Sequence, residues 1–150
     1  MSIATLVLGS SGSGKSTSLR NLDPAHTILV QCIKKPLPFK ATGWKVRQSL
    51  KDEGNIIQTD DPALIEKIMR QSRHDVVVID DYQSVMVNSL MSRSSEKGYD
   101  KFADIAKSAW NIFGAAGALA PHRRVYILAH TQTDELGNIR MKTVGKMVDQ

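Results

Sequence analysis

The chain has 150 residues, of which 41% are hydrophobic and 23% charged, and its formal net charge is +5. This length suits one compact domain with ordinary globular composition, so several domains, wholesale disorder and low complexity are excluded. No apolar run approaches the ~20 residues of a membrane-spanning helix, and the first eight residues lack the basic start of a signal peptide. We therefore expect one soluble domain over residues 1–150, with no membrane partner.

The single cysteine, Cys32, cannot form an internal disulfide, and with four scattered histidines it cannot build a cysteine-based zinc site. A reducing, cytoplasmic setting is the expectation. The positive charge favours a polyanionic partner only weakly, because many basic proteins bind no nucleic acid.

Five apolar segments rich in β-branched residues predict strands. They are near-continuous runs rather than alternations, which is typical of strands buried on both faces of a sheet. In chain order they cover residues 3–8, 27–33, 55–58, 76–79 and 125–129, of which 55–58 is the weakest.

Helical patterns lie between these segments. Helix-forming residues follow Thr17, and Asp61 with Pro62 is a typical helix start, because the carboxylate caps free amide groups and proline fits the first position. Asp100 is expected to cap a longer helix with one apolar stripe, stopped by Pro121. The alternation predicts an α/β fold, with a mainly parallel sheet and helices on both faces.

Three stretches lack a clear period, namely residues 34–54, 92–99 and 131–150. The last is expected to hold a hairpin, with Leu136-Gly137-Asn138 as its turn. The chain stops directly after this patterned segment, which suggests a fragment of a longer protein.

Residues 9–16 read Gly-Ser-Ser-Gly-Ser-Gly-Lys-Ser, a complete G-x-x-x-x-G-K-S motif between a strand and a helical pattern. A glycine-rich backbone can turn its N–H groups toward a polyphosphate, and a helix start adds partial positive charge. Lys15 would contact the β- and γ-phosphates and Ser16 would coordinate Mg²⁺. The alternative is a flexible turn. The predicted nucleotide-binding residues are Gly9, Ser10, Ser11, Gly12, Ser13, Gly14, Lys15, Ser16 and Thr17.

A second acidic motif supports this interpretation, because the apolar segment 76–79 ends in Asp80 and Asp81. Asp80 is expected to hold the Mg²⁺ water shell opposite Ser16, and Asp81 to orient an attacking water. A buried strand before a turn capped by an Asp side chain would look the same.

Polar residues also follow the segment 125–129. We call residues 9–17 the phosphate loop. If the strand 125–129 lies between the strand before the phosphate loop and the strand that ends at Asp80, His130 or Gln132 would face the γ-phosphate and sense hydrolysis. Otherwise they form an ordinary polar loop. The candidate catalytic residues are therefore Lys15, Asp81 and His130.

Residues 24–51 contain no acidic residue but several cations and two aromatic residues. Single-stranded nucleic acid is bound by this mixture, with cations along the backbone and aromatic rings for bases. The alternative is a solvated loop whose Trp44 packs on the domain. The candidate DNA-binding residues are Lys34, Lys35, Lys40, Trp44, Lys45 and Arg47.

The chain has a second set of basic residues. In a ring or filament, these residues would enter the ATP site of a neighbouring subunit and neutralise charge in the transition state. The alternative is that they are ordinary surface charges. The set contains Arg140, Lys142 and Lys146, together with Arg123 and Arg124.

The chain resembles the phage-encoded, RecA-like phosphate-loop ATPases of the AAA-family ATP-binding type, which include single-strand annealing proteins of phage recombination. The blocks Lys-Pro-Leu-Pro-Phe at 35–39 and Glu-Lys-Gly-Tyr-Asp-Lys-Phe at 96–102 are the most specific parts of this resemblance. The matching stretches span nearly the whole chain in order, at 8–17, 35–39, 77–83, 96–102, 127–131 and 142–146.

The resemblance implies a RecA-like fold, the cofactors ATP and Mg²⁺, and DNA recombination in the host cytoplasm, with a homo-oligomer that binds and anneals single-stranded DNA. RecA-like enzymes commonly place an acidic catalytic residue at the end of the second strand, where this chain has Gln31 and Cys32. Either Asp81 takes over water activation or hydrolysis is weak. A helicase or packaging motor is the alternative within this fold, and a small-molecule kinase is the alternative from another class.

Overall fold

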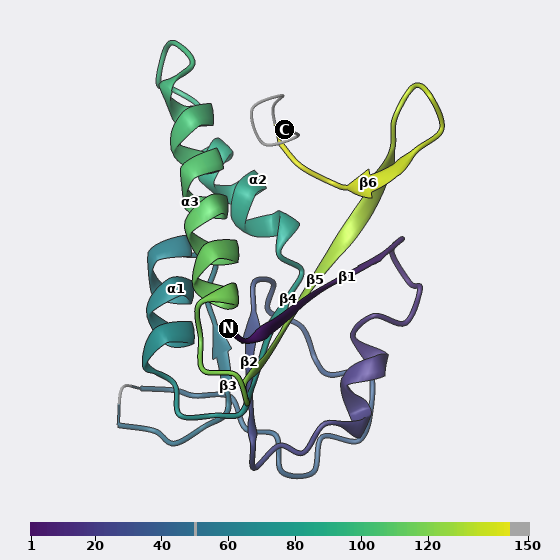
Figure 1. The fold of residues 1–150 in the computed structure, drawn as a ribbon, viewed down its shortest axis with the longest axis vertical. Coiled ribbons are helices and arrows are strands. Elements are labelled where there is room, and N and C mark those ends of the chain that lie inside the picture. Colours follow the sequence, from purple (N-terminus) through teal and green to yellow (C-terminus); the bar gives the residue numbers. More distant parts are fainter. Residues whose placement is uncertain (50, 145–150) are drawn as a thin grey trace.

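The computed structural model describes residues 1–49 and 51–144, and Figure 1 shows a twisted sheet with helices packed against it. All five expected strands form, and α2 is a helix that the sequence did not predict. In chain order the elements are β1 (Ile3–Gly9), the 3₁₀ helix η1 (Thr17–Asn21), β2 (Thr27–Gln31), β3 (Ile56–Gln58), α1 (Pro62–Gln71), β4 (Val76–Asp80), α2 (Gln83–Ser92), α3 (Asp100–Gly117), β5 (Arg124–Thr133) and β6 (Ile139–Met141).

The strand order is β1-β5-β4-β2-β3, and all of these neighbours pair in parallel. β5 thus lies between the phosphate-loop strand and the Asp80 strand, the arrangement on which the hypothesis for His130 depends. Gly9 is in register with His130, and Gln31 with Asp80. Because the carboxyl ends of parallel strands share one edge of a sheet, the loops after these strands meet there.

The expected C-terminal hairpin is confirmed. β6 pairs antiparallel with the end of β5, from Thr131 opposite Met141 to Thr133 opposite Ile139. Gly137 lies in the connecting turn with φ of +81°, a backbone conformation that favours glycine. β5 therefore extends beyond the apolar segment 125–129, because its polar end pairs with β6 in this hairpin.

The two faces of the sheet are covered differently, as Figure 1 shows. The helices α1, α2 and α3 lie together on one face, where Ile65, Met86 and Ile112 belong to the main apolar core. The other face is covered by η1 and by residues 37–46, through a second apolar cluster that includes Leu19, Phe39 and Trp44.

The expectation of helices on both faces of the sheet is therefore wrong for α-helices, because α1, α2 and α3 all lie on one face. The helical pattern after Thr17 forms only the short η1, because Pro24 disfavours helical backbone at Asp23 and ends the segment before a stable helix can form.

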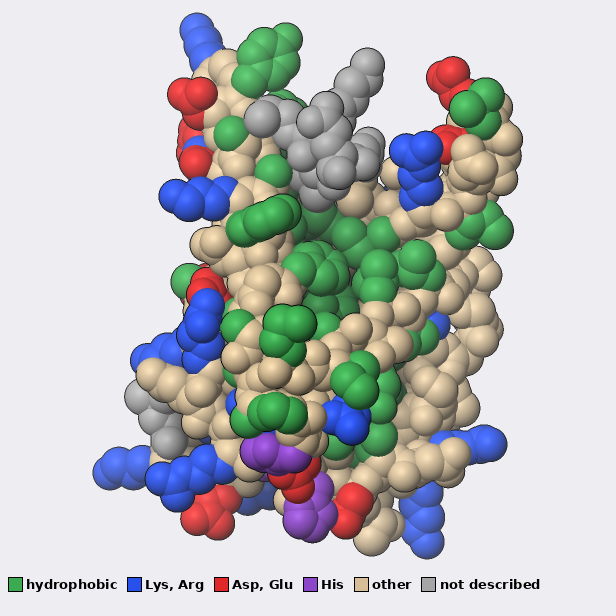
Figure 2. All heavy atoms as spheres, viewed as in Figure 1, with side chains coloured by type: hydrophobic (Ala, Val, Ile, Leu, Met, Phe, Trp, Pro, Cys, Tyr) green, Lys and Arg blue, Asp and Glu red, His purple; other side chains and the backbone are tan. Residues whose placement is uncertain are grey.

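β1 lies at the open edge of the sheet. Ile3, Leu6 and Leu8 are 55%, 42% and 37% exposed, and Figure 2 shows hydrophobic side chains gathered at the surface on this side of the molecule. β2 and β4 are almost entirely buried. The expectation that the apolar strands are buried on both faces therefore holds for β2 and β4 but is wrong for β1, which lacks a second neighbouring strand among the described residues.

α1 begins where the sequence predicts. The Asp61 carboxylate accepts a hydrogen bond of 2.9 Å from the Ala63 amide, and Pro62 occupies the first helical position. α3 differs slightly, because Asp100 lies in its first turn and Tyr99 takes the cap position without a side-chain bond. None of the helices in the described ranges is long and apolar enough to cross a membrane.

Asp61→Ala should lower the free energy of unfolding by about 1 kcal/mol, because it removes the acceptor for a free amide at the start of α1. Asp61→Asn, which retains a capping oxygen, should have a much smaller effect. Urea unfolding followed by circular dichroism measures both variants. Equal stability of the two would show that this cap does not stabilise the helix.

Candidate functional site

A cavity of about 390 Å³ opens where the loops after β1, β2, β4 and β5 meet. One side is the phosphate loop, which contributes residues 11–17, and the other side carries Lys35, Asp81 and His130. The three candidate catalytic residues, Lys15, Asp81 and His130, therefore line one cavity, although they come from three separate parts of the chain.

The backbone of the phosphate loop has glycine conformations and several amide groups without a backbone partner. Gly12 and Gly14 have φ values of +74° and +90°, which glycine adopts without strain. A Cβ atom at Gly9 would collide with Ser13 Oγ and lie 3.3 Å from Ser13 Cβ, so a larger residue there would have to displace the Ser13 side chain. Within the described chain, the amide groups of Gly12, Gly14, Lys15 and Ser16 make no backbone hydrogen bond, so they are available to phosphate oxygens.

Lys15 folds back over its own loop. Its ammonium donates hydrogen bonds of 2.8 Å to the carbonyl oxygens of Gly9 and Ser10. Burial lowers the pKa of Lys15 below its ordinary value, although the charges of Asp81 and Asp80 act in the opposite direction. The ammonium is thus held at the loop, where the β- and γ-phosphates are predicted to bind.

Ser16 and Asp80, the two predicted Mg²⁺ ligands, are in direct contact. The Ser16 hydroxyl donates a 2.8 Å hydrogen bond to Asp80 Oδ2. The Asp80 side chain is 1% exposed, and its Oδ1 atom has no hydrogen-bond partner among the described residues. Hydroxyl and carboxylate oxygens are ligands that Mg²⁺ prefers, so these residues fit the metal.

The described residues contain no cluster of three acidic, histidine or cysteine side chains suited to a metal. A magnesium ion here would therefore take its remaining ligands from water and phosphate, which is its usual behaviour at nucleotide sites.

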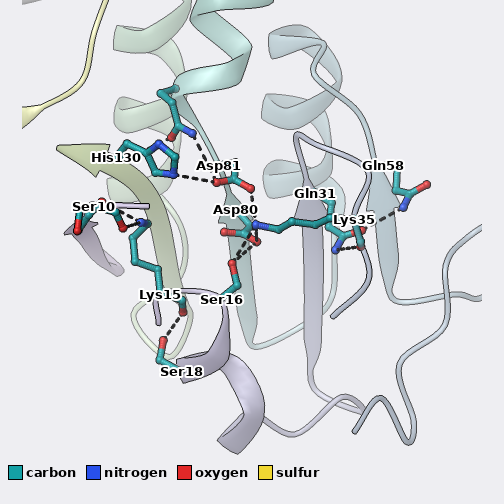
Figure 3. Close-up of polar contacts among 12 residues, drawn as sticks. Ser10, Lys15, Ser16, Ser18, Gln31, Lys35, Gln58, Asp80, Asp81 and His130 are labelled. Carbon is teal, nitrogen blue, oxygen red and sulfur yellow. Dashed lines mark hydrogen bonds and ion pairs between the residues drawn. The ribbon is translucent and has the colours of Figure 1, made fainter. Parts of the chain in front are cut away.

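Lys35 occupies the centre of this acidic site, although the sequence predicted that it would contact DNA. Its Nζ atom lies 3.0 Å from Ser16 Oγ and 3.0 Å from Asp80 Oδ2, and it also donates to Asp81 Oδ2, as Figure 3 shows. Burial acts to lower the pKa of Lys35, but the hydrogen bonds and charges of Asp81 and Asp80 outweigh it and raise the pKa above its ordinary value.

A chain of glutamine contacts supports this lysine. The buried Gln31 side chain at the end of β2 donates 3.0 Å to the Lys35 carbonyl oxygen, and Gln58 on β3 donates 3.0 Å to Gln31 Oε1. Sequence reasoning missed both roles. The signal available in the sequence was the end of β2, where Gln31 is followed closely by Lys34 and Lys35. RecA-like enzymes commonly have an acidic residue at the end of this strand.

Asp81 and His130 are held together by a third residue, Gln83, which the sequence did not single out. His130 Nε2 lies 3.6 Å from Asp81 Oδ1, and the Gln83 side chain accepts a 3.1 Å hydrogen bond from the His130 amide. Burial, and next the charge of Lys15, lower the pKa of His130 below its ordinary value, although the charge of Asp81 acts in the opposite direction. Asp81 has φ of +59°, which is disfavoured for a residue with a Cβ atom.

The other candidate DNA-binding residues lie outside the cavity. Trp44 packs edge-on against Phe39 with ring centroids 6.2 Å apart and joins the second apolar cluster, which was the alternative left open by the sequence. Lys45 pairs with Asp52 at 3.3 Å, and Arg47 Nε donates to the Gly54 carbonyl oxygen. Lys34 and Lys40 are exposed.

The second basic set is divided. Arg140 pairs with Asp134 at 2.9 Å within the hairpin, whereas the Lys142 side chain is exposed. Arg123 is buried and donates to the Met69 and His74 carbonyl oxygens, so it is a structural residue. Lys146 lies outside the described residues.

In comparisons with known proteins, no family model matches this chain, and no curated protein matches it either. The functional assignment therefore depends on the geometry of the cavity.

Asp81→Gly should be more stable than Asp81→Ala by about 1 kcal/mol, because alanine keeps a Cβ atom in the left-handed backbone region. Both variants remove the carboxylate, so their difference isolates the backbone conformation. Urea unfolding of the pair gives the comparison. An alanine variant at least as stable as the glycine variant would show that the backbone relaxes freely.

Proposed function

We propose that this protein binds ATP with Mg²⁺ in the cavity and hydrolyses it, as a RecA-like phosphate-loop ATPase. One observation carries this proposal: the phosphate loop, with amide groups free to bind an anion, faces Asp81 across one cavity, and the buried Asp80 is hydrogen-bonded to Ser16 of that loop. The strand order, with β5 between β1 and β4, supports it further.

Each residue has a distinct role in this proposal. The loop amides and Lys15 bind the phosphate chain. Ser16 and Asp80 hold the metal, which when bound would neutralise charge on the terminal phosphate. Asp81 orients the attacking water and accepts its proton, and His130 lies beside Asp81 in the lining of the same cavity.

We assign the nucleotide as ATP on two grounds. The sequence contains no N-K-x-D motif for guanine recognition, and the family that the chain resembles uses ATP. A kinase built on the same loop would instead transfer the phosphoryl group to a small acceptor, so analysis of the products separates the two activities. Free phosphate supports the ATPase, and a phosphorylated acceptor supports the kinase.

We further propose that the ATPase acts in DNA recombination in the cytoplasm of the host cell, as a homo-oligomer that binds and anneals single-stranded DNA. The exposed Lys34 and Lys40 support this role, because they belong to the acid-free segment that also carries Lys35 into the cavity. Strand-displacement assays with and without ATP distinguish annealing from a helicase or packaging motor.

Lys15→Ala should weaken ATP binding at least about tenfold, equivalent to about 1.4 kcal/mol, because it removes a cation from the phosphate site. Arg20→Ala is the control, since it removes an exposed cation on η1 that does not line the cavity. Isothermal titration calorimetry at saturating Mg²⁺ measures both. Unchanged ATP affinity in Lys15→Ala would show that the loop is not a phosphate site.

Binding to single-stranded DNA should weaken as salt rises, because lysines that bind phosphates release counterions. Lys34→Ala with Lys40→Ala should reduce the slope of log affinity against log salt by about 0.7 for each lysine–phosphate pair that the substitutions remove. Lys107→Ala on α3 serves as the control, because this exposed lysine lies on an element away from the segment. Fluorescence anisotropy with a labelled oligonucleotide gives the slopes. Equal affinity at low and high salt would remove the DNA hypothesis.

A further inference from the structure

The ammonium group of Lys35 lies at the position where the Mg²⁺ ligands converge. Its Nζ atom is 3.0 Å from Ser16 Oγ and 3.0 Å from Asp80 Oδ2, and it also bonds to Asp81 Oδ2. We propose that Lys35 is an internal cation that fills the magnesium position in the nucleotide-free protein and exchanges with Mg²⁺ when the nucleotide binds. The link between this exchange and nucleotide binding rests on the function proposed above. The competition between Lys35 and a metal ion for the same ligands does not.

A cation is required here even without nucleotide. The Asp80 and Asp81 side chains are 1% and 7% exposed and adjacent in the chain. Two neighbouring carboxylates out of water are strongly unfavourable unless a positive charge lies between them. Lys35, whose side chain is 31% exposed, supplies that charge and stays in reach of solvent.

The lysine and a metal ion exclude each other. Magnesium binds oxygen ligands at about 2.0–2.1 Å, so an ion bound to Ser16 Oγ and Asp80 Oδ2 from the side of Lys35 would overlap an ammonium that is 3.0 Å from both atoms, and an ion bound from another side would still repel it. Overlap and repulsion between like charges force the ammonium to leave when the metal enters.

The backbone of Lys35 is held so that only its side chain needs to move. Gln31 binds the Lys35 carbonyl oxygen and is itself bound by Gln58. Lys35 also lines the cavity with Lys15 and the phosphate loop. When metal takes the carboxylates, the displaced ammonium remains in a cavity that contains phosphate, and a phosphate oxygen becomes its partner.

The exchange also frees Asp81. Its Oδ2 atom is bonded to Lys35 in the present structure. Once Lys35 leaves, this oxygen becomes available to orient a water molecule, so the residue proposed to activate water is released only when metal is bound.

The direct test measures metal binding without nucleotide, with Mn²⁺ as the probe because it takes the same oxygen ligands and its free ion is counted by electron paramagnetic resonance. Lys35→Met should bind Mn²⁺ at least about tenfold more tightly than the wild type, because the competing cation is gone. Lys51→Met, an exposed lysine on the same segment, should bind Mn²⁺ like the wild type. Equal Mn²⁺ affinity of Lys35→Met and wild type would overturn the proposal.

The loss of Lys35 leaves buried carboxylates unpaired, so the methionine variant could unfold in metal-free buffer. Recovery of its circular dichroism spectrum on addition of Mn²⁺ would support the proposal. If it stays unfolded, Lys35→Arg decides, because a guanidinium that binds both carboxylates should weaken Mn²⁺ binding at least about threefold. Unchanged Mn²⁺ affinity in the arginine variant would overturn the proposal.

A second measurement compares ATP affinity with Mg²⁺ and with a chelator. In the wild type, Lys35 neutralises the carboxylates, so metal-free ATP still binds. In Lys35→Met, metal-free ATP would meet the uncompensated negative charge of Asp80 and Asp81. The ratio of the two affinities should therefore rise at least about tenfold in the variant, equivalent to about 1.4 kcal/mol. An unchanged ratio would refute the exchange. A wild type that binds no ATP would refute the proposed function instead, and the Mn²⁺ result would still decide the role of Lys35.

Discussion

Two adjacent carboxylates at the end of β4 impose a strong electrostatic demand on the surrounding structure. Asp80 and Asp81 are almost completely buried, and an unpaired charge in such a place costs several kcal/mol. The chain meets this demand with residues from two other loops: Ser16 donates a hydrogen bond and Lys35 supplies the positive charge. The parallel order of the sheet makes this convergence possible, because it brings the ends of the strands to one edge.

Features that depend on local sequence were predictable. Continuous apolar runs gave the strands, and the spacing of Gly12, Gly14 and Lys15 gave a loop whose conformation agrees with a phosphate-binding motif. The helix α2 was not predictable in this way. Its buried side begins with the polar Gln83 and Ser84, so no continuous apolar stripe marks it as a helix. Gln83 is inside because its side chain connects Asp81 to the backbone of β5.

The position of Lys35 was beyond local reasoning for a different reason. In the sequence it is one of several cations in a proline-containing segment that also carries two aromatic residues, a mixture that occurs in sites for single-stranded nucleic acid. Its contact with Asp81 spans 46 positions of the chain and exists only because β2 lies beside β4. The position of Trp44 was also beyond local reasoning. Trp44 packs in the second apolar cluster, on the face of the sheet that the three α-helices leave uncovered.

The arrangement around Lys35 also limits what the proposed binding of nucleotide would change in the structure. Leu37 and Phe39, a few residues further on, pack in the apolar cluster that covers the second face of the sheet. If the whole segment moved with the ammonium, that cluster would open and its buried apolar area would return to water. Because Gln31 holds the Lys35 carbonyl oxygen, rotation of the Lys35 side chain alone is enough to move its ammonium away from Ser16 and Asp80. The exchange that we propose between Lys35 and Mg²⁺ would therefore leave the surrounding fold packed.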